Sequence, residues 1–347
     1  MVNTPEFIRS TVVSTRIRFA RNLAAFPFPS KMKPTHAAEI LHLLSAGLKE
    51  IDPNEYVGYE LEKLSDSEKA LLQEEHLISP ALLKKADNRA VFISSDRAVS
   101  IMVNEEDHLR EQYICKGFEL YKAYERLMAL DDGLATVLDF AYDKTLGYLT
   151  ACPSNLGTGM RASVMMFLPG LTWTGEIKRI VSLLRGNGMT LRGAFGEGTS
   201  AEGYLYQISN ERTLGRSEKE ILDQVTEFTM SICDQELRAR EEMLKTSETE
   251  LRDRCLRAYG TLTNCALLDM TEFMSKIVDV RLGLVLGFLK AKDRQKFDEF
   301  LDDMQPAAFC LNNNLEGENE RFYDEVRAET VCSVLPKLVQ VVRRGSR

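Results

Sequence analysis

The sequence predicts an α+β fold: a largely antiparallel sheet flanked by helices, followed by an all-helical C-terminal domain. Three observations support this. Up to about residue 210, short β-rich runs come in pairs around polar turns; capped helical patterns separate them; and beyond Leu244 the pattern is helical without a convincing strand. Paired runs of this kind form hairpins, which are antiparallel, whereas parallel strands need a long crossover. The 347 residues suggest about two domains.

The N-terminal elements follow in order. STRIRFAR (14–21) alternates arginines with apolar residues at strand spacing, and 35–51 repeats its apolar residues at helical spacing. Ser65–Glu68 is a capping box that opens a second helix. Residues 90–104 contain two β runs around an SSDR turn, and 134–152 show a similar pattern. These segments therefore predict two helices and two hairpins.

The later elements are a helix and a strand within 175–193, separated by a Gly-Asn-Gly turn, and a strand at 204–210. A second capping box, Ser217–Glu220, opens a helix that we expect to run to about Leu244. Residues 235–254 are almost wholly polar, which is typical of an exposed helix end and a linker. Helical segments, including 265–289, then continue past residue 339. We therefore expect a catalytic domain over 1–250 and a helical domain over 251–347.

Composition narrows the class of protein. The net charge of −8 argues against a nucleic-acid-binding protein, which normally carries a basic patch. The seven cysteines are scattered, without a CxxC pair, as is usual in a reducing cytosol. The N-terminus lacks a secretory pattern, and no apolar stretch approaches the ~20 residues that span a membrane. We expect a soluble, cytoplasmic protein without a membrane segment and without a metal site built from its own side chains.

Two segments combine arginines with acidic residues. Arg16 and Arg18 should leave one face of a strand together and form a seat for phosphate oxygens; the alternative is a solvated edge strand. In NEEDHLR (104–110), Glu105 or Glu106 would hold a cationic group while Arg110 reaches an anion. The alternative for this segment is a helix capped by Asn104 with acids in its first turn.

Two further segments are rich in glycine. CPSNLGTGMRASV (152–164) suits a turn with a buried Cys152, or a backbone cradle with Arg161 aimed at phosphate and a polarised thiol. LRGAFGEGTSAEG (191–203) does not fit GxGxxG, and we expect a mobile loop that carries Arg192 and Glu197. The arginines of the four segments suit a polyphosphate, and the glutamates suit a cation that accepts the phosphoryl group.

In order and spacing, these segments and the later YQISNERTLG resemble the signatures of the phosphagen (guanidino) kinases, over about residues 12–240. The bacterial protein arginine kinases are the most similar subgroup, because STRIR begins at Ser14 and the additional helical region lies at the C-terminus. The resemblance implies the guanidino kinase catalytic fold and an ATP:guanidino phosphotransferase. It also implies transfer of the γ-phosphate to arginine side chains of proteins, which marks them for Clp-type proteolysis.

The resemblance also assigns roles. Glu106 and Glu197 would clamp the guanidinium, with Glu106 as the base, and Cys152 would orient or polarise it. The phosphates of MgATP would bind Ser14, Arg16, Arg18, Arg110, Arg161 and Arg192. Two alternatives stay open: a kinase of free arginine or another small guanidine, and a non-catalytic adaptor that binds phosphoarginine.

In the resembled subgroup an RDxxRA motif of the C-terminal domain recognises phosphoarginine. Here the matching stretch is YDEVRA: Asp324 and Arg327 are kept and Tyr323 replaces the first arginine, although Arg321 could compensate. Tyrosine cannot make the bidentate phosphate contact. The expected partners are protein substrates with exposed arginine, a Clp-type protease or chaperone, a zinc-binding activator protein and a second copy of the chain.

Overall fold

The computed structural model describes residues 6–84, 87–193 and 202–343. The chain is divided into two compact units. The first, called here the sheet unit, comprises Met1–Met166, Lys178–Thr199 and Tyr206–Cys233, and the second, the helical unit, comprises Phe167–Ile177, Ser200–Leu205 and Asp234–Arg347.

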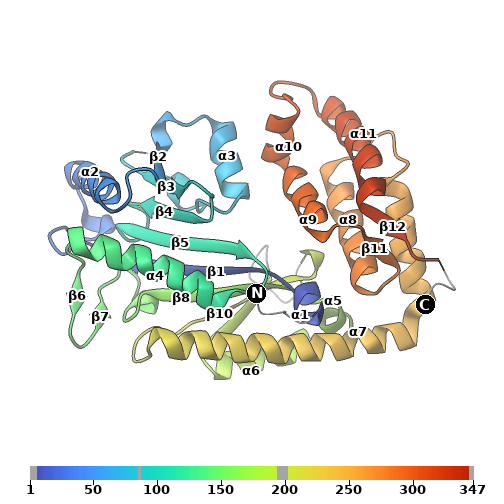
Figure 1. Cartoon of the computed structure of the whole chain (residues 1–347), viewed down its shortest axis with the longest axis horizontal. Helices are drawn as coiled ribbons and strands as arrows, with labels where there is room; N and C mark the ends of the chain where they lie inside the picture. Colours follow the sequence, from blue (N-terminus) through green and yellow to red (C-terminus); the bar gives the residue numbers. More distant parts are fainter. Residues whose placement is uncertain (1–5, 85–86, 194–201, 344–347) are drawn as a thin grey trace. The chain divides into compact units, whose positions relative to one another are not determined.

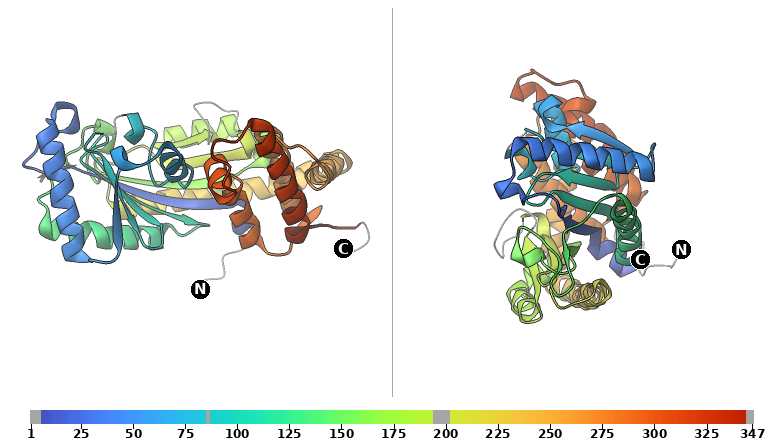
Figure 2. Two further views of the ribbon diagram at one scale, coloured as in Figure 1. Left: turned by 90° about the horizontal axis from the view of Figure 1, so that it is seen from above. Right: turned by 90° about the vertical axis from the view of Figure 1, so that its left-hand side faces the viewer.

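The sheet unit is built on an eight-stranded sheet with the order β2-β3-β4-β5-β1-β8-β10-β9. The strand pairs with a described register are antiparallel, as the hairpin pattern predicts. Figure 2 shows the long strand β1 in dark blue, near the middle of this sheet. The strands are β1 (Val12–Arg21), β2 (Tyr56–Glu60), β3 (Ala90–Ser94), β4 (Val99–Val103), β5 (Leu109–Lys116), β8 (Met160–Phe167), β9 (Met189–Gly193) and β10 (Leu205–Asn210).

Helices cover the sheet where its residues are apolar. Figure 1 shows α4 along β1 and β5, and it packs there against the face that carries Ile17 and Phe19. The predicted capping box at Ser65 is present, with both reciprocal hydrogen bonds. The helices of this unit are α1 (Glu6–Thr11), α2 (Pro34–Ile51), α3 (Asp66–Glu74), α4 (Leu120–Val137), α6 (Ile177–Gly186) and the first part of α7 (Glu218–Leu262).

The helical unit has its own apolar core, which includes Phe273, Phe297, Val331 and Leu335. A short antiparallel pair, β11 (Leu289–Ala291) with β12 (Val339–Val341), accompanies the helices. These helices are α5 (Pro169–Trp173), the rest of α7, α8 (Met270–Val285), α9 (Arg294–Asp303), α10 (Pro306–Asn312) and α11 (Glu320–Leu338). No helix in the described ranges has the length and apolarity that crossing a bilayer requires.

Four local expectations were wrong, although the fold class is confirmed. Residues 134–137 end α4, and only the two-residue strands β6 (Tyr142–Asp143) and β7 (Gly147–Tyr148) form the second hairpin. Most of the linker expected near 245–254 is helical, because buried side chains such as Leu251 and Cys255 anchor this part of α7. The helix is interrupted only at Ser247, where φ is −147° and ψ is 32°, close to the helix end expected at about Leu244. The strands β11 and β12 were not expected. Finally, 104–108 form a loop between β4 and β5 rather than a capped helix.

Candidate active site

Five arginines from four strands lie on one face of the sheet, opposite the face that α4 covers. Arg16 and Arg18 alternate with the buried Ile17 and Phe19 along β1, so they leave the sheet together. Arg161 of β8 lies directly opposite Arg18, while Arg110 of β5 lies opposite Ala20 on the same face. Arg192 of β9 pairs with Gln207, whose side chain accepts from Arg16 Nη2 at 3.2 Å. Sequence positions almost two hundred residues apart therefore form one cationic surface.

These guanidinium groups are partly desolvated and repel one another. Burial, together with Arg110 and Arg161, lowers the pKa of Arg16 to about 10. Burial and the charges of Arg16, Arg110 and Arg161 hold the pKa of Arg18 well below its usual value. Within the described residues, the buried Nε of Arg18 has no hydrogen-bond partner. A polyanion would supply both the missing charge and the missing acceptor. The face thus fits the phosphates of ATP.

Neighbouring polar side chains orient two of the arginines. Arg161 donates from Nε and Nη2 to Ser209 Oγ, at 3.3 and 2.9 Å. Arg110 Nη1 donates to Glu105 Oε2 at 2.8 Å, and Ser79 Oγ donates to Glu105 Oε1 at 2.5 Å. The Glu105 side chain is only 4% exposed. Glu105, which the sequence left as an alternative to Glu106, therefore holds Arg110.

Glu106 has a different environment. It is exposed, unlike its neighbours in the loop 104–108, and its pKa is raised by partial burial and by Asp107 and Glu105. Arg110 and the nearby Cys152 thiol partly offset that rise. The Cys152 Sγ atom itself lies 3.0 Å from Ser154 Oγ. The structure thus brings together two of the three residues expected to contact the guanidinium, Glu106 and Cys152.

The loop 104–108 is fixed to the segment that carries Cys152. Asp107 Oδ1 accepts from Ala151 N at 2.7 Å and from Asn22 Nδ2 at 2.6 Å. Asn104 has φ +61°, and its backbone N–H donates to the carbonyl oxygen of His108 at 2.8 Å, closing the loop. These contacts, between chain segments far apart in sequence, set the position of Glu106 relative to Cys152.

The glycines of CPSNLGTGMRASV are required by the backbone. Gly157 and Gly159 have φ +110° and +64°, and the segment passes from a short 3₁₀ helix (Pro153–Asn155) into β8. A Cβ at Gly159 would lie 2.6 Å from Arg21 Nη1 and 2.7 Å from the carbonyl oxygen of Ala20. The close approach therefore packs this turn against β1, next to Arg18 and Arg161.

The remaining candidate residues of the site are Glu197 and Ser14. Glu197 lies outside the described residues. Ser14 lies on β1 at a register shift, on the side of Arg16 and Arg18. Sequence reasoning missed Ser79, Gln207 and Ser209; the polar alternation of YQISN was a signal for the last two. No local pattern distinguishes Ser79.

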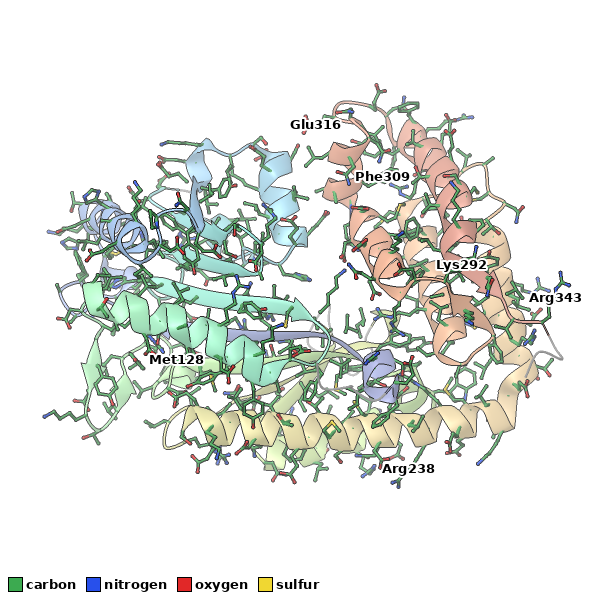
Figure 3. All side chains as sticks on the ribbon, viewed as in Figure 1. Met128, Arg238, Lys292, Phe309, Glu316 and Arg343 are labelled. Carbon is green, nitrogen blue, oxygen red and sulfur yellow. The ribbon has the colours of Figure 1, made fainter. Side chains whose placement is uncertain are left out.

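The candidate phosphoarginine residues lie in the helical unit. Arg327 is buried, and its Nη1 donates to the Leu268 carbonyl at 2.7 Å and to Asp324 Oδ1 at 2.8 Å. Its guanidinium also lies 5.4 Å from the ring centroid of Phe309, a residue of α10 labelled in Figure 3. Tyr323 Oη lies 3.1 Å from Cys310 Sγ. The kept residues of the motif thus contact each other and the loop after α7.

Comparison with known proteins identifies the family to which this chain belongs. Residues 39–239 match the family described as ATP:guanido phosphotransferase, C-terminal catalytic domain, and the chain belongs to this family. Among solved structures, lombricine kinase is similar with a TM-score of 0.60 and 27% identity, over 66% of this chain and 67% of that one. The duplicated taurocyamine kinase from Schistosoma mansoni has a TM-score of 0.62 and 27% identity, over 71% of this chain and 36% of that one.

Matches that extend over most of the chain show to which branch of the family it belongs. Residues 248–343 match the protein-arginine kinase McsB C-terminal domain. The protein-arginine kinase of Caldanaerobacter subterraneus subsp. tengcongensis is 42% identical over 335 residues, which cover 96% of this chain and 99% of that protein. That of Geobacillus stearothermophilus is 40% identical, over 85% of this chain and 82% of that protein. The chain belongs with the protein-arginine kinases and is a guanidino phosphotransferase that uses ATP.

Proposed function

We propose that this protein transfers the γ-phosphate of ATP to arginine side chains of other proteins. The observation that carries the proposal is the set of five arginines on one sheet face beside the Glu106–Cys152 pair. The names of its relatives support a protein acceptor.

The proposed chemistry uses the site as follows. A guanidinium nitrogen attacks the γ-phosphorus, the N–P bond forms, and the bond from that phosphorus to the bridging oxygen breaks, leaving ADP. Phosphoryl transfer needs positioning and neutralisation of charge rather than covalent help, which the arginine face supplies. The high pKa of a guanidinium keeps it protonated at neutral pH, and the protonated form is a poor nucleophile because its nitrogen lone pairs are delocalised. Its proton must therefore leave as the bond forms. Glu106 accepts that proton, while Cys152 and Glu197 orient the acceptor.

Mg²⁺ belongs to this proposal through the nucleotide. The described residues contain no group of three His, Cys, Asp or Glu side chains that would hold a metal ion. The phosphates of ATP would therefore supply ligands for Mg²⁺, which would neutralise charge during transfer. Ser14 and the five arginines would hold the phosphates.

The test is mass spectrometry at neutral pH, since N–P bonds are acid-labile, after incubation with MgATP and either an unfolded arginine-rich protein or free arginine. Phosphoarginine on the protein only, lost in Glu106→Gln and Arg161→Ala, is expected. Product with free arginine only would instead establish a small-guanidine kinase. No product with either, even with added zinc-binding activator protein, would favour a phosphoarginine-binding adaptor.

The wider role rests on the resemblance to bacterial protein arginine kinases. We propose that phosphorylated clients go to a Clp-type protease in the cytoplasm, where reduced thiols such as the seven free cysteines are stable. A client phosphorylated by this protein should be degraded faster by a purified Clp protease than its unphosphorylated form, and equal rates would contradict the proposal.

The C-terminal part has two proposed roles. We place the functional division near residue 250 and propose that 251–347 bind phosphoarginine through Asp324 and Arg327 and pair two chains. Exposed apolar side chains there, Leu267, Phe322 and Val341, support pairing. A monomeric mass in solution scattering at micromolar concentration would contradict a dimer. Calorimetry with phosphoarginine, compared between the natural chain and Arg327→Ala, tests binding.

A further inference from the structure

Two thiols of the helical unit lie close together, and neither belongs to the candidate active-site residues described above. Cys265 Sγ in the segment after α7 is 3.9 Å from Cys332 Sγ on α11. Cys332 Sγ also lies 3.4 Å from the carbonyl oxygen of Cys265, so the two residues meet through main chain as well as side chain. Both thiols are free and partly buried.

Hydrogen bonds on both sides of Cys265 tie this part of the chain to α11 and to β12, which directly follows α11. Before it, near the end of α7, Tyr259 Oη donates to the carbonyl oxygen of Val339, the first residue of β12, at 3.0 Å. After it, Leu268 N donates to the Asp324 carbonyl at 3.2 Å, and Arg327 Nη1 donates back to the Leu268 carbonyl at 2.7 Å. Contacts at both ends keep the two sulfur atoms near each other in the folded state. A disulfide S–S bond is about 2.05 Å long, so the two sulfur atoms must approach by about 2 Å for the bond to form.

We propose that Cys265 and Cys332 are a modification site at which a small-molecule disulfide, such as oxidised glutathione, forms an intramolecular disulfide. One thiolate attacks a sulfur of the small disulfide and releases one thiolate. The second cysteine then loses its proton and attacks the mixed disulfide, which forms the Cys265–Cys332 bond and releases the second thiolate. Two protein thiols are oxidised and one small disulfide is reduced to two thiols.

The bond would fasten the segment after α7 to α11 and would link residues that are 67 positions apart. A cross-link across a chain of that length lowers the entropy of the unfolded state, so the oxidised protein should be the more stable form. It would also fix the segment whose Leu268 carbonyl holds Arg327. This inference does not rest on the proposed kinase activity.

The pKa of Cys265 sets the expected rate. Burial and Cys332 raise it to about 11, so the thiolate is scarce at neutral pH. Because the thiolate is the nucleophile, its concentration and the rate through Cys265 should rise about tenfold for each pH unit between 7 and 10. The reaction is therefore slow at pH 7.

The test treats the reduced full-length protein with excess oxidised glutathione at pH 7, 8 and 9, blocks remaining thiols and digests it with trypsin without reductant. A linked pair of the tryptic peptides 258–276 and 328–337 is expected, forming faster at higher pH. The oxidised protein should unfold at a higher temperature, and added thiol should reverse both effects. Cys310→Ser is the matched control, because Cys310 lies in the same unit, is also partly buried and contacts Tyr323 rather than a thiol. It should still form the linked pair.

Cys265→Ser and Cys332→Ser should each form no linked pair, and either one suffices if the other does not fold. The proposal is overturned if the natural protein accumulates separate glutathione adducts on the two cysteines, or if the linked pair forms only in denaturant. It is also overturned if pairs of Cys310 with Cys265 or Cys332 form equally fast.

Discussion

The cationic face of the sheet should destabilise the protein when no nucleotide is bound. Arg16 and Arg21 lie on the same strand, on opposite faces, and their surroundings differ. Arg16 is partly buried beside Arg110 and Arg161. Arg21 is fully buried in an ion pair with Asp131, with Nη2 and Oδ2 2.7 Å apart. We predict that replacement by methionine stabilises the protein at position 16 and destabilises it at position 21.

The pKa of Arg16 gives the magnitude. It is lowered to about 10, so at every pH below about 10 the folded state holds a charge that it disfavours, and that cost is relieved as the pH rises through 10. A lowering of more than two pKa units corresponds to about 3 kcal/mol at neutral pH. Loss of the hydrogen bond to Gln207 offsets about 1 kcal/mol of this gain. Arg16→Met should therefore raise the free energy of unfolding by about 2 kcal/mol, or the unfolding midpoint by about 4–8 °C.

Differential scanning calorimetry with and without MgATP checks this prediction. The natural protein should gain stability from MgATP because the ligand binds only the folded state, whereas Arg16→Met should lose most of that gain. Arg21→Met should lower stability by about 3–5 kcal/mol, because it leaves the Asp131 carboxylate buried without its partner. A lower midpoint for Arg16→Met without nucleotide, or a full response of that variant to MgATP, would refute the reasoning.

Three further predictions concern single residues. Because the pKa of Glu106 is raised, kcat/KM should fall on the acidic side at a higher pH than for an ordinary carboxylate. Cys152→Ala removes a thiol that lowers this pKa and should move the fall to still higher pH, as measured in pH–rate profiles. Gly159→Ala should lower the unfolding free energy in urea by about 2–3 kcal/mol, because its φ is positive and a Cβ has no room. Burial lowers the pKa of His108, so stability should fall as the pH drops below about 6.5, where the unfolded chain takes up the proton that the folded chain resists.

Each of these three predictions would be contradicted by one specific result. If Cys152→Ala leaves the acidic limb of the pH–rate profile unchanged, the thiol does not influence the pKa of Glu106. A Gly159→Ala variant as stable as the natural chain would mean that the turn moves freely away from β1. His108→Gln should reduce the loss of stability between pH 6.5 and 5, and an unchanged loss would assign it to other groups.

Local chemistry made much of the fold predictable. Alternation of arginines with Ile17 and Phe19 placed Arg16 and Arg18 on one face, and the Ser65–Glu68 and Ser217–Glu220 capping boxes form as expected. Errors arose where tertiary burial outweighs local composition, as in the polar part of α7 that Leu251 anchors. The strands β11 and β12 have only three residues each, too few to show a period.

What the sequence by itself determined is therefore the set of candidate site residues, the shared face of Arg16 and Arg18 on their strand, and the order of segments that is typical of the family. Only the tertiary structure decided the surroundings of the two glutamates. Glu105 and Glu106 are adjacent and identical in type, yet one is buried against Arg110 and Ser79 and the other is exposed beside Cys152. Their difference comes from strand register and loop docking, which depend on contacts between distant parts of the chain, whereas a local pattern describes only near neighbours.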